Sequence, residues 1–257
     1  MTSGEKFEKL LRIMQQLRGE NGCPWDKEQT HQSLRQYLLE ETYEVLECLD
    51  DNNLKELPKE LGDLLLQIVF HAQIGREEGS FSIDDVLDAI IQKLIDRHPH
   101  VFGDKVIKTA KEQEKHWERL KKNEGKKSVL DGVPRELSGL LRAYRLQQKA
   151  ASVGFDWDQI EQVWEKLHEE IEELRHALQA GKIKNIEDEF GDLLFALVNI
   201  SRFLNVNPED ALRGSIEKFI RRFRKIEAHF QKQHRELHQV SLEEMDAVWE
   251  QAKAEET

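Results

Sequence analysis

The sequence has few of the residues that break a chain or cross-link it. Its 257 residues include 5 prolines, 14 glycines and 2 cysteines. So little proline and glycine argues against a linker-rich or all-β chain, and it excludes collagen-like and other fibrous classes. Two cysteines are too few for a disulfide framework, which favours the reducing cytoplasm as the compartment.

Long apolar runs and an excess of basic charge are also missing. The apolar stretches are short, residues 193–198 being an example, whereas a membrane-spanning helix needs about 20 apolar residues. Residues 1–10 show no signal-peptide pattern. Lys and Arg total 38 against 50 Asp and Glu, a net charge of −12. Because such a field repels nucleic acid, we expect neither a membrane nor a nucleic-acid partner.

The sequence does contain a long internal repeat. Two acidic motifs of the first half recur in the second at a constant offset of 129 residues, and flanking tryptophans recur at an offset of 132. Several ordered matches are hard to obtain by chance, even in a chain rich in Glu. We therefore predict two homologous domains, residues 1–125 and 126–257.

Apolar residues spaced three and four apart predict an all-α fold in both halves. Helix starts are marked by Ser82 with Asp85 and by Ser241 with Glu244, which resemble capping boxes. We expect about five helices per half, with the central ones forming a bundle of the four-helix type.

Each half carries two pairs of acids, with three-residue spacing in each pair and the two pairs on consecutive predicted helices. The members are Glu41, Glu44, Glu60 and Asp63 in the first half, and Glu170, Glu173, Glu189 and Asp192 in the second. This spacing puts both acids of a pair on one helix face, and antiparallel packing would bring all four together. A single such pair is usually a solvated helix face.

The acids of both halves lie on faces that also carry apolar residues, so a solvated face does not explain them. Carboxylates crowded together at such a place need cations or protons. An all-oxygen ligand set without Cys or His is typical of Mg²⁺, with Mn²⁺ also possible. Gly62 and Gly191 lie inside these helices, where glycine costs about 1 kcal/mol relative to Ala. We attribute them to a close helix approach beside the acids.

A cationic pair follows the acids in each half, Lys93 with Arg97 and Lys218 with Arg222. Beside a metal cluster such a pair would hold a polyphosphate, with Arg as a fork and Lys as a point charge. A solvated basic stripe explains the local sequence equally well. Trp117 and Trp249 could stack on a base, although core packing is the plainer interpretation.

The chain resembles the MazG nucleoside triphosphate pyrophosphohydrolases over essentially its whole length. The resemblance is carried by Glu-Glu-x-x-Glu followed by Glu-x-x-Asp and by the segments 21–26, 39–44, 60–64, 98–102, 153–157 and 190–195. It implies two tandem MazG-type α bundles, a homodimer, and hydrolysis of ribo- and deoxynucleoside triphosphates to monophosphate and pyrophosphate with broad base tolerance.

The resemblance also implies roles for single residues of the second half, which usually carries the activity in this family. Mg²⁺ would be held by Glu170, Glu173, Glu189 and Asp192, the phosphates by Lys218 and Arg222, and the nucleoside would lie at Trp249. Lys166 and Glu169 would line the same pocket. The first half keeps its own acids together with Lys93, Arg97 and Trp117, so the sequence does not show it to be inactive.

We expect water attack at the α-phosphorus, with Glu169 or Glu173 orienting or deprotonating the water. Two alternatives stay open from the sequence. A di-iron bundle would need Glu-x-x-His on two helices, but Glu165/His168 and Glu173/His176 fall on one predicted helix. A non-catalytic nucleotide- and metal-binding scaffold would use the same acids without turnover.

Overall fold

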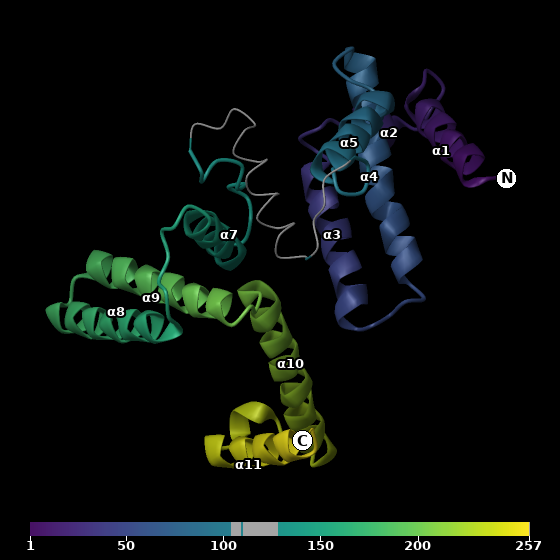
Figure 1. Cartoon of the computed structure of the whole chain (residues 1–257). Helices are drawn as coiled ribbons and strands as arrows, with labels where there is room; N and C mark the ends of the chain where they lie inside the picture. The colour runs from purple at the N-terminus through teal and green to yellow at the C-terminus, as the bar shows by residue number, and fades with distance from the viewer. Residues whose placement is uncertain (104–108, 110–127, 257) are drawn as a thin grey trace. The chain divides into compact units, whose positions relative to one another are not determined.

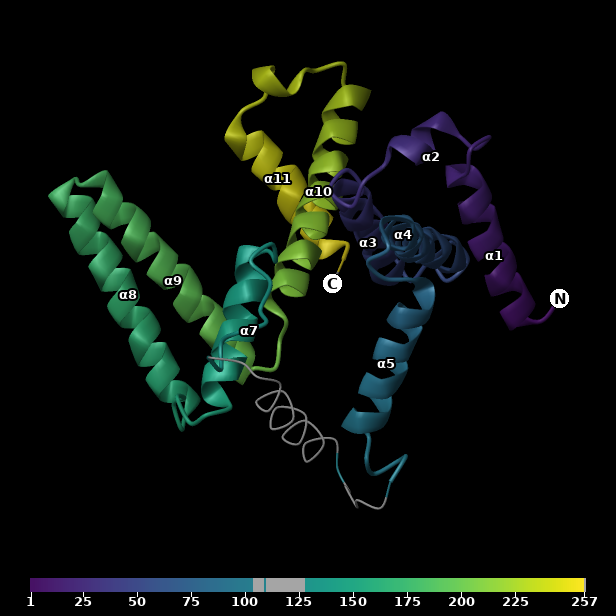
Figure 2. The ribbon, with the colours of Figure 1, turned by 90° about the horizontal axis from the view of Figure 1, so that it is seen from above.

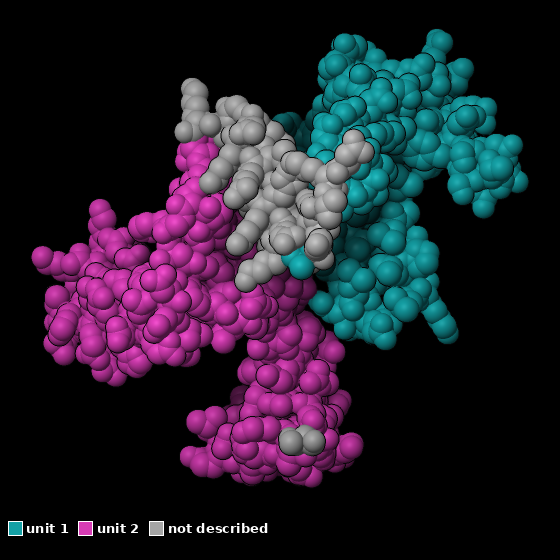
Figure 3. Space-filling view, viewed as in Figure 1, with its two compact units in different colours: residues 1–112 teal, residues 113–257 magenta. Residues whose placement is uncertain are grey.

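The protein is described here by a computed structural model that covers residues 1–103, 109 and 128–256. These residues form helices and loops and contain no strand, which confirms the all-α prediction. The chain divides into two compact units, Met1–Glu112 and Gln113–Thr257 (Figure 3). The predicted domain boundary at 125/126 lies outside the described residues and stays a prediction.

Unit 1 is built around a hairpin of two long helices, α3 and α4 (Figures 1 and 2). Helix α1 packs against α4, and α5 follows α4 directly. The helices are α1 (Ser3–Arg18), α2 (Pro24–Glu28), α3 (Arg35–Asp50), α4 (Leu57–Glu78) and α5 (Ile83–Arg97).

Unit 2 repeats the hairpin as α8 and α9, with α7 and α10 in contact with α9 and with each other. A second hairpin follows, in which α11 packs against α10 (Figure 1). The elements are α7 (Gly139–Ala151), α8 (Ile160–Ala180), α9 (Ile183–Phe203), α10 (Pro208–Lys232), the 3-10 turn η1 (Leu237–Gln239) and α11 (Leu242–Ala254).

The helix ends lie where the sequence marks them. Ser82 and Ser241 are N-caps of α5 and α11, and each forms a full capping box with the acid three residues later. Gly79 and Gly181 end α4 and α8 with φ of 68° and 70°, a left-handed conformation that glycine adopts without strain. None of the described helices is long and apolar enough to cross a membrane.

Each unit has its own core. In unit 1, Met14 of α1, Leu34 and the α4 residues Val69, Phe70 and Ile74 form one buried cluster. In unit 2, one cluster joins α8 to α9 through Val163, Leu167, Ala196 and Ile200. A second joins α10 to α11 through Ile226, Phe230 and Val240. The apolar periodicity therefore closes hairpins of consecutive helices in unit 2, whereas in unit 1 it joins α1 to α4.

The two helix glycines do not have the role that we assigned to them. A Cβ atom built at Gly62 or Gly191 meets no atom within 4 Å among the described residues. The interpretation of a close helix approach within the chain is therefore wrong. Both glycines lie on exposed helix surface, where an alanine would fit.

A histidine pair joins the loop before α3 to α4. The Nδ1 atoms of His31 and His71 lie 2.7 Å apart, so one nitrogen donates a hydrogen bond and the other accepts it. The rings are nearly parallel, with an angle of 9° between their planes. Partial burial and the neighbouring His31 lower the pKa of His71, because both disfavour its charged form.

Unit 1 is therefore expected to lose stability as the pH falls below about 6.5, the ordinary pKa of histidine. The unfolded chain takes up a proton at His71 near this pH, whereas the folded chain does so only at lower pH. Urea unfolding of the wild type and of His71→Phe between about pH 5 and 7 measures the effect. The variant keeps an aromatic ring at this position but cannot take up a proton there, so its stability should depend less on pH. An equally steep dependence in both proteins would contradict the assignment.

Candidate active site

Three carboxylates of unit 2 converge on the α8–α9 hairpin. Glu170 and Glu173 lie three residues apart on α8, and Glu189 lies in the first half of α9. One oxygen from each lies within 4.8 Å of one oxygen from each of the others. The i, i+3 spacing and the packing of α8 against α9 thus bring together three of the four acids that the sequence predicts as ligands.

Glu170 is the buried member of this cluster, with a relative exposure of 5%. Its Oε1 atom lies 2.7 Å from the Lys166 ammonium, which also bonds Glu169 at 2.8 Å. Among the described residues, its buried Oε2 atom has no hydrogen-bond donor. A buried carboxylate oxygen without a donor is costly, so this atom is suited to a cation that the chain itself does not supply.

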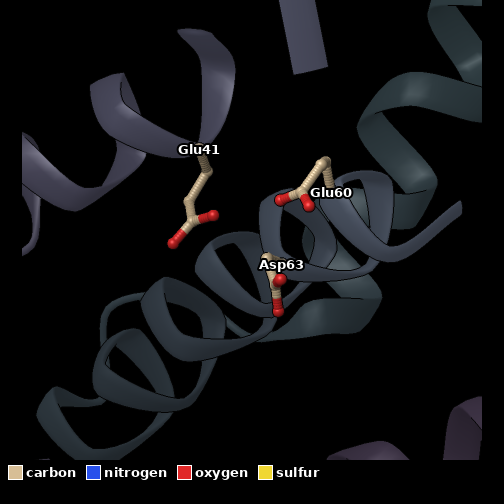
Figure 4. A group of neighbouring side chains, drawn as sticks. All are labelled: Glu41, Glu60 and Asp63. Atoms are coloured by element: carbon tan, nitrogen blue, oxygen red, sulfur yellow. The ribbon is translucent and has the colours of Figure 1, made fainter. Parts of the chain in front are cut away.

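Unit 1 holds a second cluster on the equivalent hairpin. Figure 4 shows Glu41 of α3 pointing toward Glu60 and Asp63 of α4, and the ligand atoms again lie within 4.8 Å of one another. Glu60 is 7% exposed. Its Oε1 accepts a hydrogen bond of 3.0 Å from Lys59, and its buried Oε2 has no donor within the described part of the chain.

Burial and crowding raise the pKa of one acid in each cluster. Burial, followed by repulsion from Glu44 and Asp63, raises the pKa of Glu41. Burial, followed by repulsion from Glu170, raises the pKa of Glu173. The charged forms of Glu41 and Glu173 are therefore disfavoured, and a divalent ion would relieve that cost.

The fourth predicted acid of each half lies outside its cluster. Asp192 is exposed on α9 and is not one of the three converging residues. Glu44 is also exposed and is not one of the three converging residues of unit 1. The roles predicted for Asp192 and Glu44 as metal ligands stay predictions.

The predicted phosphate contacts lie on the other hairpin of unit 2. Lys218 is exposed on α10, and Arg222 is half-buried one turn later. The Arg222 guanidinium lies over the Trp249 ring, 5.6 Å from its centroid, and bonds Glu256 through Nε at 2.8 Å. Trp249 packs on Phe219 and belongs to the α10–α11 core. Acids and cations therefore lie on different helix pairs, α8–α9 and α10–α11.

Lys93 and Arg97 of the first half lie on α5, with Lys93 exposed and Arg97 half-buried. Trp117 lies outside the described residues.

The structure also includes partners that sequence reasoning missed. Lys59, the partner of Glu60, could have been found from the sequence, since it directly precedes that predicted ligand. No sequence pattern marks Glu256 as the partner of Arg222, because it is one of many acids in a charged C-terminal segment.

The histidines of the di-iron alternative take no part in the clusters. His168 bonds the backbone oxygen of Trp164 through Nδ1 at 2.7 Å. Within the described residues, both groups capable of holding a metal contain carboxylates alone. This ligand chemistry favours a hard cation over a histidine-bound iron pair.

Comparison with known proteins agrees with the internal repeat. Residues 29–102 and 159–226 each match the MazG nucleotide pyrophosphohydrolase domain. The chain is 47% identical to "Nucleoside triphosphate pyrophosphohydrolase/pyrophosphatase MazG" of Thermotoga maritima, over 98% of this chain and 97% of the relative. It is 45% identical to "Nucleoside triphosphate pyrophosphohydrolase" of Escherichia coli K12, over 98% of both chains.

A third relative, YabN of Bacillus subtilis, is described as uncharacterized and is 47% identical over 98% of this chain, which covers 52% of YabN. Both matched segments contain a complete set of the predicted acids. The chain belongs to the MazG family and carries one copy of the domain in each half.

Proposed function

We propose that the protein is a Mg²⁺-dependent nucleoside triphosphate pyrophosphohydrolase, which converts a ribo- or deoxynucleoside triphosphate and water into a monophosphate and pyrophosphate. The observation that carries this proposal is the three-carboxylate cluster around Glu170 inside a matched MazG domain, with a buried oxygen that lacks a donor among the described residues. The names of the two full-length relatives support the same activity.

The donor set supports Mg²⁺, with Mn²⁺ as a substitute. Glu170, Glu173 and Glu189 would hold the ion, and Asp192 would join them after a change of side-chain rotamer. All four offer only oxygen, which is the preference of hard divalent ions. A divalent ion held by these residues would supply Lewis acidity, which neutralises phosphate charge and lowers the pKa of a water molecule.

The remaining groups have separate tasks in the proposed reaction. Glu169 or Glu173 orients the attacking water and accepts its proton, and Lys166 holds Glu169 and Glu170 in place. Attack at the α-phosphorus breaks the bond to the bridging oxygen and releases pyrophosphate. Lys218 and Arg222 neutralise the charge that grows on this leaving group.

Trp249 would supply an aromatic face for the base. Stacking accepts any base, because every base has a π-face, and this supports broad base tolerance. The first half would bind a second metal ion through Glu41, Glu60 and Asp63, with Glu44 as a further ligand. Its buried Glu60 oxygen supports this site in the same way as the Glu170 oxygen supports the other.

A homodimer is the proposed assembly. Helices α8 and α9 expose large apolar side chains near the acids, and a second copy of the chain would cover them. The exposed residues are Trp164, Leu178, Phe190, Leu194, Phe195 and Leu197. The free cysteines Cys23 and Cys48 support a cytoplasmic location, and the net charge of −12 argues against nucleic acid as a partner.

Product analysis tests the proposed function. The purified protein is incubated with Mg²⁺ and a panel of ribo- and deoxynucleoside triphosphates, and the products are separated by chromatography. We expect monophosphate and pyrophosphate in equal amounts, and no products in the presence of EDTA. ADP and phosphate from ATP would contradict attack at the α-phosphorus. Nucleotide binding without turnover would favour the scaffold alternative.

A further inference from the structure

Two neighbouring arginines of α10 share one carboxylate from the chain's C-terminal segment. Arg221 and Arg222 each donate a hydrogen bond of 2.8 Å from Nε, the first to Oε1 and the second to Oε2 of Glu256. The carboxylate follows α11 directly and its side chain is 19% exposed. The Arg222 side chain is 14% exposed, whereas that of Arg221 is 56% exposed.

The contact holds one edge of the Arg222 guanidinium. Glu256 engages Nε, and Trp249 lies against the face of the group at 5.6 Å. Within the described residues, neither contact uses the two terminal Nη atoms. These atoms form the fork with which an arginine binds two oxygens of a phosphate. Glu256 therefore fixes the direction of the fork without occupying it.

The charges around Glu256 also indicate that it orients the Arg222 guanidinium rather than neutralising it. Two guanidinium groups share a single carboxylate, so one positive charge remains at this place. The two arginines lower the pKa of Glu256 to about 2, so it stays ionised at neutral pH. A carboxylate that blocked the phosphate site would instead occupy the Nη fork of Arg222.

We propose that Glu256 is a positioning residue of the pyrophosphohydrolase site, which orients the Arg222 guanidinium so that its Nη fork faces the substrate phosphates. This inference rests on the proposed function, because it assumes that Arg222 contacts those phosphates. It adds the C-terminal segment after α11 to the parts of the chain that determine nucleotide affinity.

Steady-state kinetics of Mg-ATP hydrolysis tests the proposal. Glu256→Gln keeps the shape of the side chain but removes its charge and weakens its hold on both arginines. We expect KM to rise about tenfold, because Arg222 contacts the phosphates already in the bound substrate, and kcat to fall as well, because the same contact neutralises charge that grows in the transition state. Glu256→Asp should restore part of the affinity. A merely structural role would lower the active fraction, and hence kcat, at unchanged KM.

Glu255→Gln is the matched control. Glu255 lies in the same segment but pairs with Lys225 at 2.9 Å, which is not a predicted phosphate contact. Its loss should leave KM and kcat unchanged. In an Arg222→Gln background, Glu256→Gln should cause no further change, because the residue that it positions is gone. Thermal unfolding monitors folding of every variant.

The outcomes separate this inference from the proposed function. If the wild type hydrolyses ATP but Glu256→Gln behaves like Glu255→Gln, the positioning role is refuted and the enzyme remains. Additive effects of Glu256→Gln and Arg222→Gln would refute it as well. If the wild type binds ATP without turnover, the same comparison is made on the dissociation constant. A wild type that neither binds nor hydrolyses ATP overturns both.

Discussion

Replacing Glu170 with Gln is expected to reduce kcat/KM for nucleoside triphosphate hydrolysis about 10³-fold, since the side chain contributes the buried carboxylate of the metal cluster. The amide keeps the size of the side chain but cannot provide two anionic oxygens. Release of pyrophosphate at saturating Mg²⁺ measures the loss. A reduction of less than tenfold would remove Glu170 from the metal site.

The change in stability should depend on the metal. Without Mg²⁺, Glu170→Gln removes one of several crowded negative charges but also loses the ion pair with Lys166, and since these effects oppose each other the unfolding temperature should stay near that of the wild type. With Mg²⁺, the wild type should gain stability by mass action and the variant should gain less. Thermal unfolding with and without the ion distinguishes a lost ligand from a damaged fold.

Two controls accompany this variant. Glu172→Gln removes a charge from the same helix, but Glu172 is exposed and pairs with Arg175 at 2.6 Å, so activity should persist. Glu60→Gln removes the equivalent buried acid of the first half. Full activity of Glu60→Gln would assign catalysis to the second half. A loss as large as that of Glu170→Gln would show that the two halves cooperate.

The double substitution Leu194→Glu/Leu197→Glu is expected to dissociate the proposed homodimer. The two leucines are 40% and 45% exposed and lie one helix turn apart on α9. Since less than half of each leucine remains to be buried, the two would contribute about 1–3 kcal/mol per copy at an interface, and the introduced charges would add a desolvation cost, so the dimer dissociation constant should rise by at least about 10². Light scattering after size-exclusion chromatography, over a range of concentrations, measures the change.

Leu242→Glu provides the control, because Leu242 is 74% exposed at the start of α11 and on a different hairpin. This variant should retain the mass of the wild type. A wild type that elutes as a monomer at all concentrations, or a double variant that stays dimeric, would show that the exposed face of α9 does not join two copies.

Much of the fold could be predicted because the relevant signals are local. A capping box such as Ser241 with Glu244 needs only three residues, and a left-handed C-cap such as Gly181 needs only one. The repeat supplied the register of the two halves. These features are determined by neighbours along the chain, so they can be recognised in the sequence before any tertiary contact is known.

The membership of the clusters could not be predicted because it depends on side-chain direction. Glu173 belongs to the cluster of unit 2, whereas its counterpart Glu44 is absent from the cluster of unit 1, although the spacing is the same in both halves. Neighbouring cations differ too, with Lys166 on α8 in one half and Lys59 on α4 in the other. Rotamers and ion pairs of this kind follow from packing, which spacing alone does not determine.

Glu256 was missed for a different reason. Its partners Arg221 and Arg222 are more than 30 residues away, and nothing near it marks it as special among the acids of the chain. Trp249 was noticed through the repeat, yet its place in the α10–α11 core agrees with the plainer interpretation as a packing residue.

The position of each acid cluster within one hairpin has a consequence for how the protein folds. The predicted ligands occupy residues 41–63 in one half and 170–192 in the other, and three of each set come together where two consecutive helices pack. Contacts of such short sequence separation require little loop-closure entropy, and chains that depend on them fold quickly. Each cluster can therefore assemble before the rest of its unit has docked, so a divalent ion present during folding would favour hairpin closure at the start rather than only stabilise the finished structure.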